Sequence, residues 1–164
     1  MNAADFPRVG LQDAIASLSV MPGFLEAALQ TSSPDELLLR ASEDGFALVE
    51  QACHLRDLER EGYLARVRRI LAEDSPALEG FDGAAVAKAR NYLAGDARAA
   101  ARDFGVARRE LIALIASLGE AELGRPAIFC GERITLADVI AMMCDHDREH
   151  RVEIEALVDA MQAP

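Results

Sequence analysis

The stretch TLADVIAMMCDHDREH, residues 135–150, opens the last helix that the sequence predicts and decides the fold. Its start, Thr135–Asp138, fits a capping box with Asp in the place of the usual Glu. An apolar stripe at helical spacing continues to about Met161, and it consists of Val139, Met142, Met143, Ile154 and Leu157. His146 and His150 fall on the same stripe. We therefore expect both histidines to point into a helical bundle.

His146 and His150 are spaced so that a helix places both imidazoles on one face, where they can offer two nitrogens to one metal ion. His54 belongs to another helical segment far earlier in the chain. If the two segments are neighbours, three neutral nitrogens converge and leave a coordination position open, as in catalytic metal sites. The pair lacks the His-Glu-x-x-His order of zinc proteases because position 147 is Asp. Taken alone, it is also compatible with core or surface histidines that make ordinary hydrogen bonds.

Three further helical segments are indicated by apolar periodicity and by breaks at proline and glycine, and they cover residues 11–30, 45–71 and 84–118. Pro22-Gly23 predicts that the first is kinked or two-part, and Gly95-Asp96 predicts a break in the third. Residues 124–133 are expected to form an extended or turning connection. No internal repeat or second domain is evident. The chain is therefore predicted to be a single all-α domain, a four-helix bundle over residues 1–164, in which the three histidines are either metal ligands between helices or core residues.

Composition limits the classes of partner. The chain has 164 residues, of which 51% are apolar and 27% charged, and its net charge of −11 argues against binding to nucleic acids. No stretch is apolar and long enough to span a bilayer, and residues 1–8 lack a basic-then-apolar leader. Cys53, Cys130 and Cys144 are odd in number and widely spaced, unlike a disulfide framework. A cytoplasmic location is expected.

Carboxylates near the histidines have two interpretations. Metal-bound histidines usually donate their second N–H to a carboxylate or carbonyl. Glu50 and Asp57 share a helix face with His54, so they are candidates for this role, although both could instead solvate a helix flank. Asp147 and Glu149 lie beside the His146–His150 pair but turn away from it on a helix, so both are expected to face solvent.

The cysteines and two arginines also have structural and functional interpretations. Cys53 and Cys144 do not share a helical face with the nearby histidines, so we predict that they are packing residues. Cys130 is expected in a loop. Arg108 and Arg125 are candidates for holding an anionic substrate, but structural pairing is favoured for both, for Arg108 with a carboxylate between helices.

Several motifs together resemble the DinB-like superfamily over roughly residues 10–160. They are GFALVEQACHLRD at 45–57, Phe104-x-x-x-Arg108-x-x-Leu111, Gly131-x-x-x-Thr135-Leu136-x-Asp138, and His146-x-x-x-His150-x-x-x-Ile154. The resemblance implies a four-helix bundle with a divalent metal held by a histidine triad, here His54, His146 and His150. The chain departs from the pattern at Phe46, where tryptophan is expected, and at Glu153, where Gln is common.

The same resemblance implies a range of functions. Family members include thiol transferases that use bacillithiol or mycothiol, and a thiol-dependent isomerase. The first hypothesis is a divalent-metal-dependent enzyme, with zinc or nickel foremost, that activates water or a low-molecular-weight thiol as a hydrolase or thiol S-transferase of a small molecule. The alternative is a non-catalytic, stress-related bundle that binds a metal or ligand. A homodimer is also expected, since symmetric pairing is common.

Overall fold

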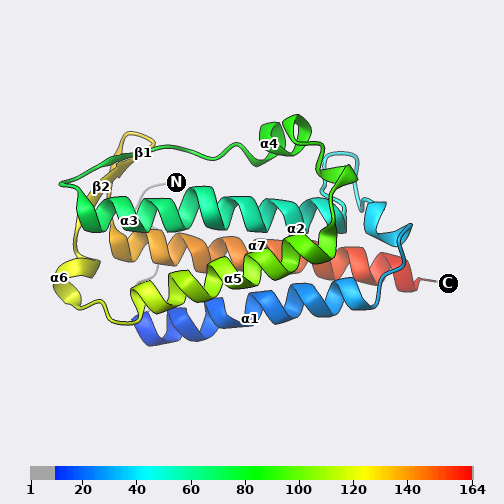
Figure 1. The fold of residues 1–164 in the computed structure, drawn as a ribbon, viewed down its shortest axis with the longest axis horizontal. Coiled ribbons are helices and arrows are strands. Elements are labelled where there is room, and N and C mark those ends of the chain that lie inside the picture. Colours follow the sequence, from blue (N-terminus) through cyan, green and yellow to red (C-terminus); the bar gives the residue numbers. More distant parts are fainter. Residues whose placement is uncertain (1–9, 164) are drawn as a thin grey trace.

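Four long helical members lie side by side in the computed structural model, which describes residues 10–163 (Figure 1). The helices are α1 (Leu11–Gln30), α2 (Leu48–Asp57), α3 (Leu64–Ala72), α4 (Gly83–Ala89), α5 (Ala97–Ile115), α6 (Glu120–Leu123) and α7 (Leu136–Gln162), with 3₁₀ turns at Glu36–Leu38 and Tyr92–Ala94. A π-helical turn, Leu58–Tyr63, joins α2 to α3 without a break. The bundle therefore consists of α1, α2–α3, α5 and α7, and the predicted all-α four-helix bundle is confirmed.

The two-part alternative for α1 is wrong, because the helix runs from Leu11 to Gln30 with Pro22 inside it. Proline has no N–H, so the carbonyl of Leu18, four residues earlier, loses its helical partner. Nη1 of Arg108 donates to that carbonyl at 2.9 Å. The acceptor that proline leaves free is therefore satisfied from α5, which ties α1 to α5 at this point.

The start of α7 follows the predicted capping box. The hydroxyl of Thr135 accepts from the backbone N–H of Asp138 at 3.3 Å, and the Asp138 carboxylate accepts from the backbone N–H of Thr135 at 2.7 Å. Both bonds satisfy N–H groups that the first turn of a helix leaves without partners. This fixes where α7 begins, and hence the position of its two histidines.

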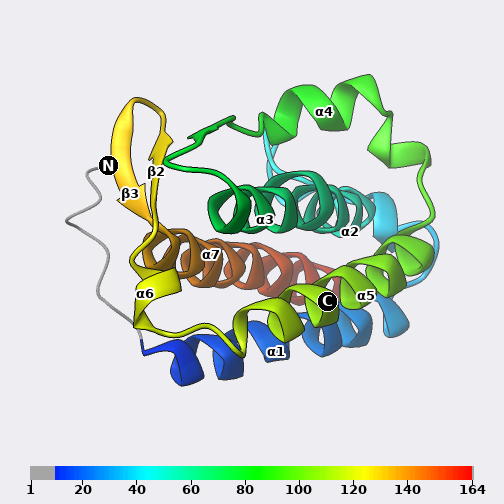
Figure 2. The same ribbon diagram turned by 60° about the vertical axis from the view of Figure 1, so that its left-hand side comes forward.

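A small sheet lies beside the start of α7 (Figure 2). β1 (Ala77–Leu78) pairs in parallel with β2 (Pro126–Phe129), which pairs antiparallel with β3 (Glu132–Thr135). The β2–β3 turn holds Cys130 at φ 52° and Gly131 at φ 81°, the two positive angles that a tight hairpin turn requires. The extended connection expected before α7 is thus a hairpin, and its pairing with β1 was not predicted.

Two apolar clusters fill the bundle, and Arg108 lies between them. Its guanidinium stacks over the ring of Phe104 at 4.8 Å, in one cluster, and bonds to the carbonyl of Leu18, in the other. Arg108 therefore connects the two apolar clusters through its side chain. Within residues 10–163, each helix is too short or too polar to cross a bilayer.

Candidate metal centre

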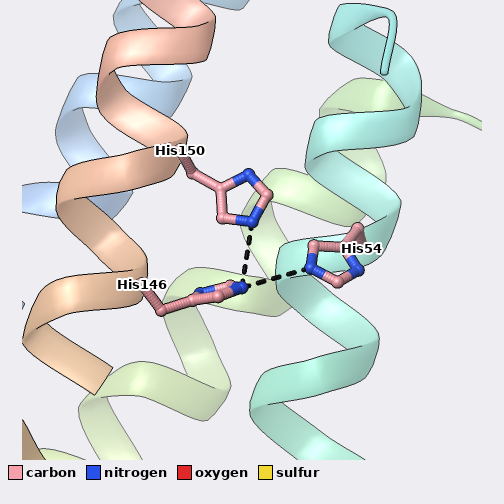
Figure 3. Close-up of side chains that lie close together, drawn as sticks. All are labelled: His54, His146 and His150. Atoms are coloured by element: carbon pink, nitrogen blue, oxygen red, sulfur yellow. Dashed lines mark hydrogen bonds between the residues drawn. The ribbon is translucent and has the colours of Figure 1, made fainter. Parts of the chain in front are cut away.

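The three histidines of the chain meet between α2 and α7 (Figure 3). Nε2 of His146 lies 3.3 Å from Nε2 of His54 and 2.9 Å from Nε2 of His150. Nitrogens bound to a tetrahedral zinc ion at roughly 2.0–2.1 Å stand about 3.3 Å apart. The donor set and its spacing therefore fit a divalent metal, and the three residues could hold one ion.

Burial keeps the rings of His54 and His146 neutral, which is the form that binds metal. Desolvation, and then the neighbouring His150, lower the pKa of His54 to about 4. Desolvation, followed by His150 and His54, lowers the pKa of His146 to about 2. Both rings therefore have a lone pair available at neutral pH without prior loss of a proton.

Gln51 orients His150. Nδ1 of His150 donates to Oε1 of Gln51 at 2.5 Å, and Nε2 of Gln51 donates to the Glu153 carboxylate at 2.7 Å. The His150 ring and the Gln51 amide, against some desolvation, lower the pKa of Glu153 to about 2. A proton on Nδ1 leaves the Nε2 lone pair of His150 directed at the other two histidines.

His54 has no such partner. Among the buried side-chain nitrogens and oxygens of residues 10–163, only Nδ1 of His54 lacks a hydrogen bond. Aromatic rings flank it, with ring centroids 5.3 Å away for Phe46 and 6.0 Å away for Phe81. On a third side lies Gly83, where a Cβ atom would sit 2.6 Å from Cε1 of His54. The Nδ1 side of the ring is thus enclosed by neighbouring groups rather than held by a hydrogen bond, and the ring's contact with His146 is through Nε2.

Neither carboxylate expected to support His54 does so. Glu50 is bound by Arg40 at 2.8 Å and caps the start of α2 by accepting from the backbone N–H of Ala47 at 2.9 Å. Asp57 accepts from three other groups: Arg56 at 2.6 Å, Arg90 at 2.7 Å and the Tyr92 hydroxyl at 2.5 Å. Both share a helix face with His54, but each carboxylate pairs instead with an arginine from another segment, Glu50 with Arg40 and Asp57 with Arg90.

A cavity of about 360 Å³ lies beside the histidines, and His146 forms part of its wall. The rest of the wall is largely apolar and includes Phe129, Ile134 and Met142. Tyr63 also lines it, with its ring 5.9 Å from the ring of His146. A small molecule in this cavity would lie next to the candidate metal position.

Comparison with known proteins identifies the family. A family model described as the DinB superfamily matches residues 18–154. The chain belongs to the DinB superfamily. Among solved structures, it is similar to one described as YfiT from Bacillus subtilis, "a probable metal-dependent hydrolase with an unusual four-helix bundle topology", with a TM-score of 0.87 and 21% identity over 96% of this chain and 94% of that one. No curated protein matches.

In this DinB-superfamily bundle, Asp147 is buried, and the prediction that it faces solvent is wrong. Its carboxylate accepts from Arg108 at 2.6 and 3.0 Å, and Arg108 also binds both oxygens of Glu59, at 2.7 and 2.9 Å. The partner that makes this burial tolerable lies on α5, so it is not visible in the sequence around Asp147. Glu149 is exposed, as predicted.

The remaining candidates are structural. Arg108 pairs with carboxylates between helices, as favoured, and Arg125 donates to the backbone carbonyls of Ile70, at 2.7 Å, and Glu73, at 3.0 Å. Cys53 and Cys144 are buried, in agreement with a packing role, and Cys130 is exposed.

Gln51 and Tyr63 are site residues that the sequence analysis missed. Gln51 precedes His54 by three residues and so shares its helix face, a signal that could have identified it. Tyr63 reaches the cavity at the end of the π turn, Leu58–Tyr63, whose extra residue changes which side chains face inward. No pattern in the sequence indicates that turn.

Proposed function

We propose that His54, His146 and His150 hold one divalent metal ion, zinc or nickel foremost, and that the chain is a metal-dependent enzyme acting on a small molecule. The convergence of the three histidines carries this proposal: the His54–His146 separation of 3.3 Å equals the ligand spacing of a tetrahedral ion, the His146–His150 separation of 2.9 Å is close to it, and one nitrogen of each residue lies within 4.8 Å of the others. Membership of the DinB superfamily and the description of YfiT as a probable metal-dependent hydrolase support it.

Three neutral imidazoles leave the full charge of a divalent cation uncompensated, and such a cation lowers the pKa of a coordinated water or thiol toward neutrality. The protein supplies the setting for this chemistry. Gln51 fixes the tautomer of His150, while the rings of Phe46 and Phe81 flank the buried ring of His54. The apolar wall of the cavity then lowers the local dielectric, which strengthens any electrostatic contact inside it.

Hydrolysis is the first reaction to test, because the description of YfiT supports it. Transfer of a low-molecular-weight thiol is the alternative that the family resemblance implies. The two differ in one requirement: a thiol transferase turns over its substrate only when the thiol is supplied. Assays of the metal-loaded protein on ester and amide substrates, with and without thiols, separate them. Metal binding without turnover in either assay would favour a non-catalytic binding protein.

Metal stoichiometry tests the site itself. Elemental analysis of protein purified without an affinity tag is compared with that of His54→Ala, His150→Ala and a control, Glu149→Ala, whose side chain is exposed next to His150. We expect about one equivalent of metal in the parent and control and a large loss in both histidine variants. A parent that stays metal-free after incubation with zinc, nickel and manganese would overturn the proposal.

A further inference from the structure

One buried cation, Arg66, lines the cavity beside the histidines. Arg66 is 9% exposed, and its guanidinium carbon lies 5.4 Å from the ring centre of Tyr63 and 4.9 Å from that of Phe129. These two rings also line the cavity. The aromatic faces hold the guanidinium in place without neutralising its charge.

Most of the hydrogen-bonding capacity of Arg66 is unused. Nε and Nη2 both donate to one acceptor, the backbone carbonyl of Glu79, at 3.2 and 2.9 Å. A guanidinium has five N–H groups, so three are left, including the pair on the Nη1–Nη2 edge. That edge has the geometry to bind a carboxylate through two parallel hydrogen bonds.

The charge of Arg66 also lacks a protein counter-ion. Among residues 10–163 it forms no ion pair with a carboxylate; burial lowers the pKa of its guanidinium, and only Tyr63 and Cys130 oppose this. Three acidic residues line the same cavity, but Glu132 and Glu149 are exposed, and Asp145 is half-buried and pairs with Arg148. A largely buried cation without an anion is unfavourable, and Nη1 of Arg66 is not among the buried unbonded nitrogens, so it is accessible to a partner from outside the chain.

We propose that Arg66 binds the carboxylate of the substrate, a small monoanion with an apolar body. The free guanidinium edge binds the anion, and Phe129, Ile134 and Met142 contact the apolar part. The acidic residues at the cavity disfavour a more highly charged ligand. Tyr63 lies within about 6 Å of both Arg66 and His146, so a molecule held at Arg66 extends along Tyr63 toward the histidines.

This inference names the substrate class of the proposed enzyme and so rests on the proposed function, but binding can be tested without activity. The probes are phenylacetate and its neutral analogue phenylacetamide, titrated by calorimetry or NMR. The proteins are the parent and Arg66→Met, each with zinc and after chelation. Arg68→Met is the control, since it removes one charge from the same helix at an exposed position.

We expect the parent and Arg68→Met to prefer phenylacetate over the amide by about tenfold, with or without zinc, and Arg66→Met to lose the preference. Arg66→Lys keeps the charge but not the paired donors, so it should retain only a few-fold preference, and it provides the test if Arg66→Met fails to fold. No preference in the parent, or an unchanged preference in the Arg66 variants, would overturn the proposal. A preference for phenylacetate that remains after chelation shows that Arg66 binds the carboxylate whether or not the histidines bind a metal.

Discussion

Two buried polar clusters lie next to each other in this bundle, and they differ in how completely they are satisfied. In the ion cluster, formed by Arg108, Glu59 and Asp147, all five N–H groups of the guanidinium donate, four to carboxylate oxygens and one to the carbonyl of Leu18. In the histidine cluster, formed by His54, His146 and His150, Nδ1 of His54 has no partner within residues 10–163, and a cavity lies alongside. The first cluster is closed, and the second is open to a ligand.

α7 contributes to both clusters through adjacent residues. Asp147 joins the ion cluster and His146 the histidine cluster, because consecutive side chains on a helix point roughly 100° apart. The ion cluster therefore fixes the rotation of α7 about its axis, and that rotation directs His146 at His54. The ion cluster thus stabilises the fold, and the position of the histidine cluster depends on it.

The largest effect is expected when the closed cluster is opened. Arg108→Met would leave the Glu59 and Asp147 carboxylates buried side by side without their common partner. We expect the free energy of unfolding to fall by about 3–5 kcal/mol, measured by urea denaturation at neutral pH. The control is Arg109→Met, an exposed arginine on the same helix. A loss no larger than that of the control would mean that the ion cluster is not the structural element inferred here.

The sequence predicts the open cluster better than the closed one. Helix spacing alone predicts that His146 and His150 lie on the inward face of α7, the bounds of α1 follow from the apolar pattern, and the start of α7 follows from its capping box. The burial of Asp147 could not be predicted in this way, because it depends on Arg108, on another helix. The same holds for Asp57, which faces Arg90 and Tyr92 from the segment after α4 rather than His54. Periodicity identifies which face is buried, but it does not identify the partner of a buried charge.

A smaller effect is expected when the shorter of the two contacts at Nδ1 of His150, the 2.5 Å bond to Gln51, is removed; the other is to Glu153, at 3.3 Å. Gln51→Leu keeps the volume at a fully buried position but removes the nearer acceptor for Nδ1 of His150 and the amide that positions Glu153. We expect metal affinity to fall about tenfold to a hundredfold, measured by competition with a chelating dye. Glu50→Gln is the control, because its side chain caps α2 and does not touch a histidine. Equal affinities in the two variants would show that Gln51 does not position His150.

The smallest effect is expected at Gly83, which lies against the Nδ1 side of His54, the side without a hydrogen bond among residues 10–163. A Cβ atom there would sit 2.6 Å from Cε1 and 2.8 Å from Nδ1 of His54, so either the ring or the first turn of α4 must move. His54 has no hydrogen bond at Nδ1 to resist displacement, so the ring should move and metal affinity should fall by about tenfold. Gly80→Ala provides the comparison, since a Cβ atom there meets nothing within 4 Å. If Gly83→Ala binds metal as tightly as Gly80→Ala, the first turn of α4 has moved instead of the His54 ring. Contact with Gly83 would then not be what holds His54 in position.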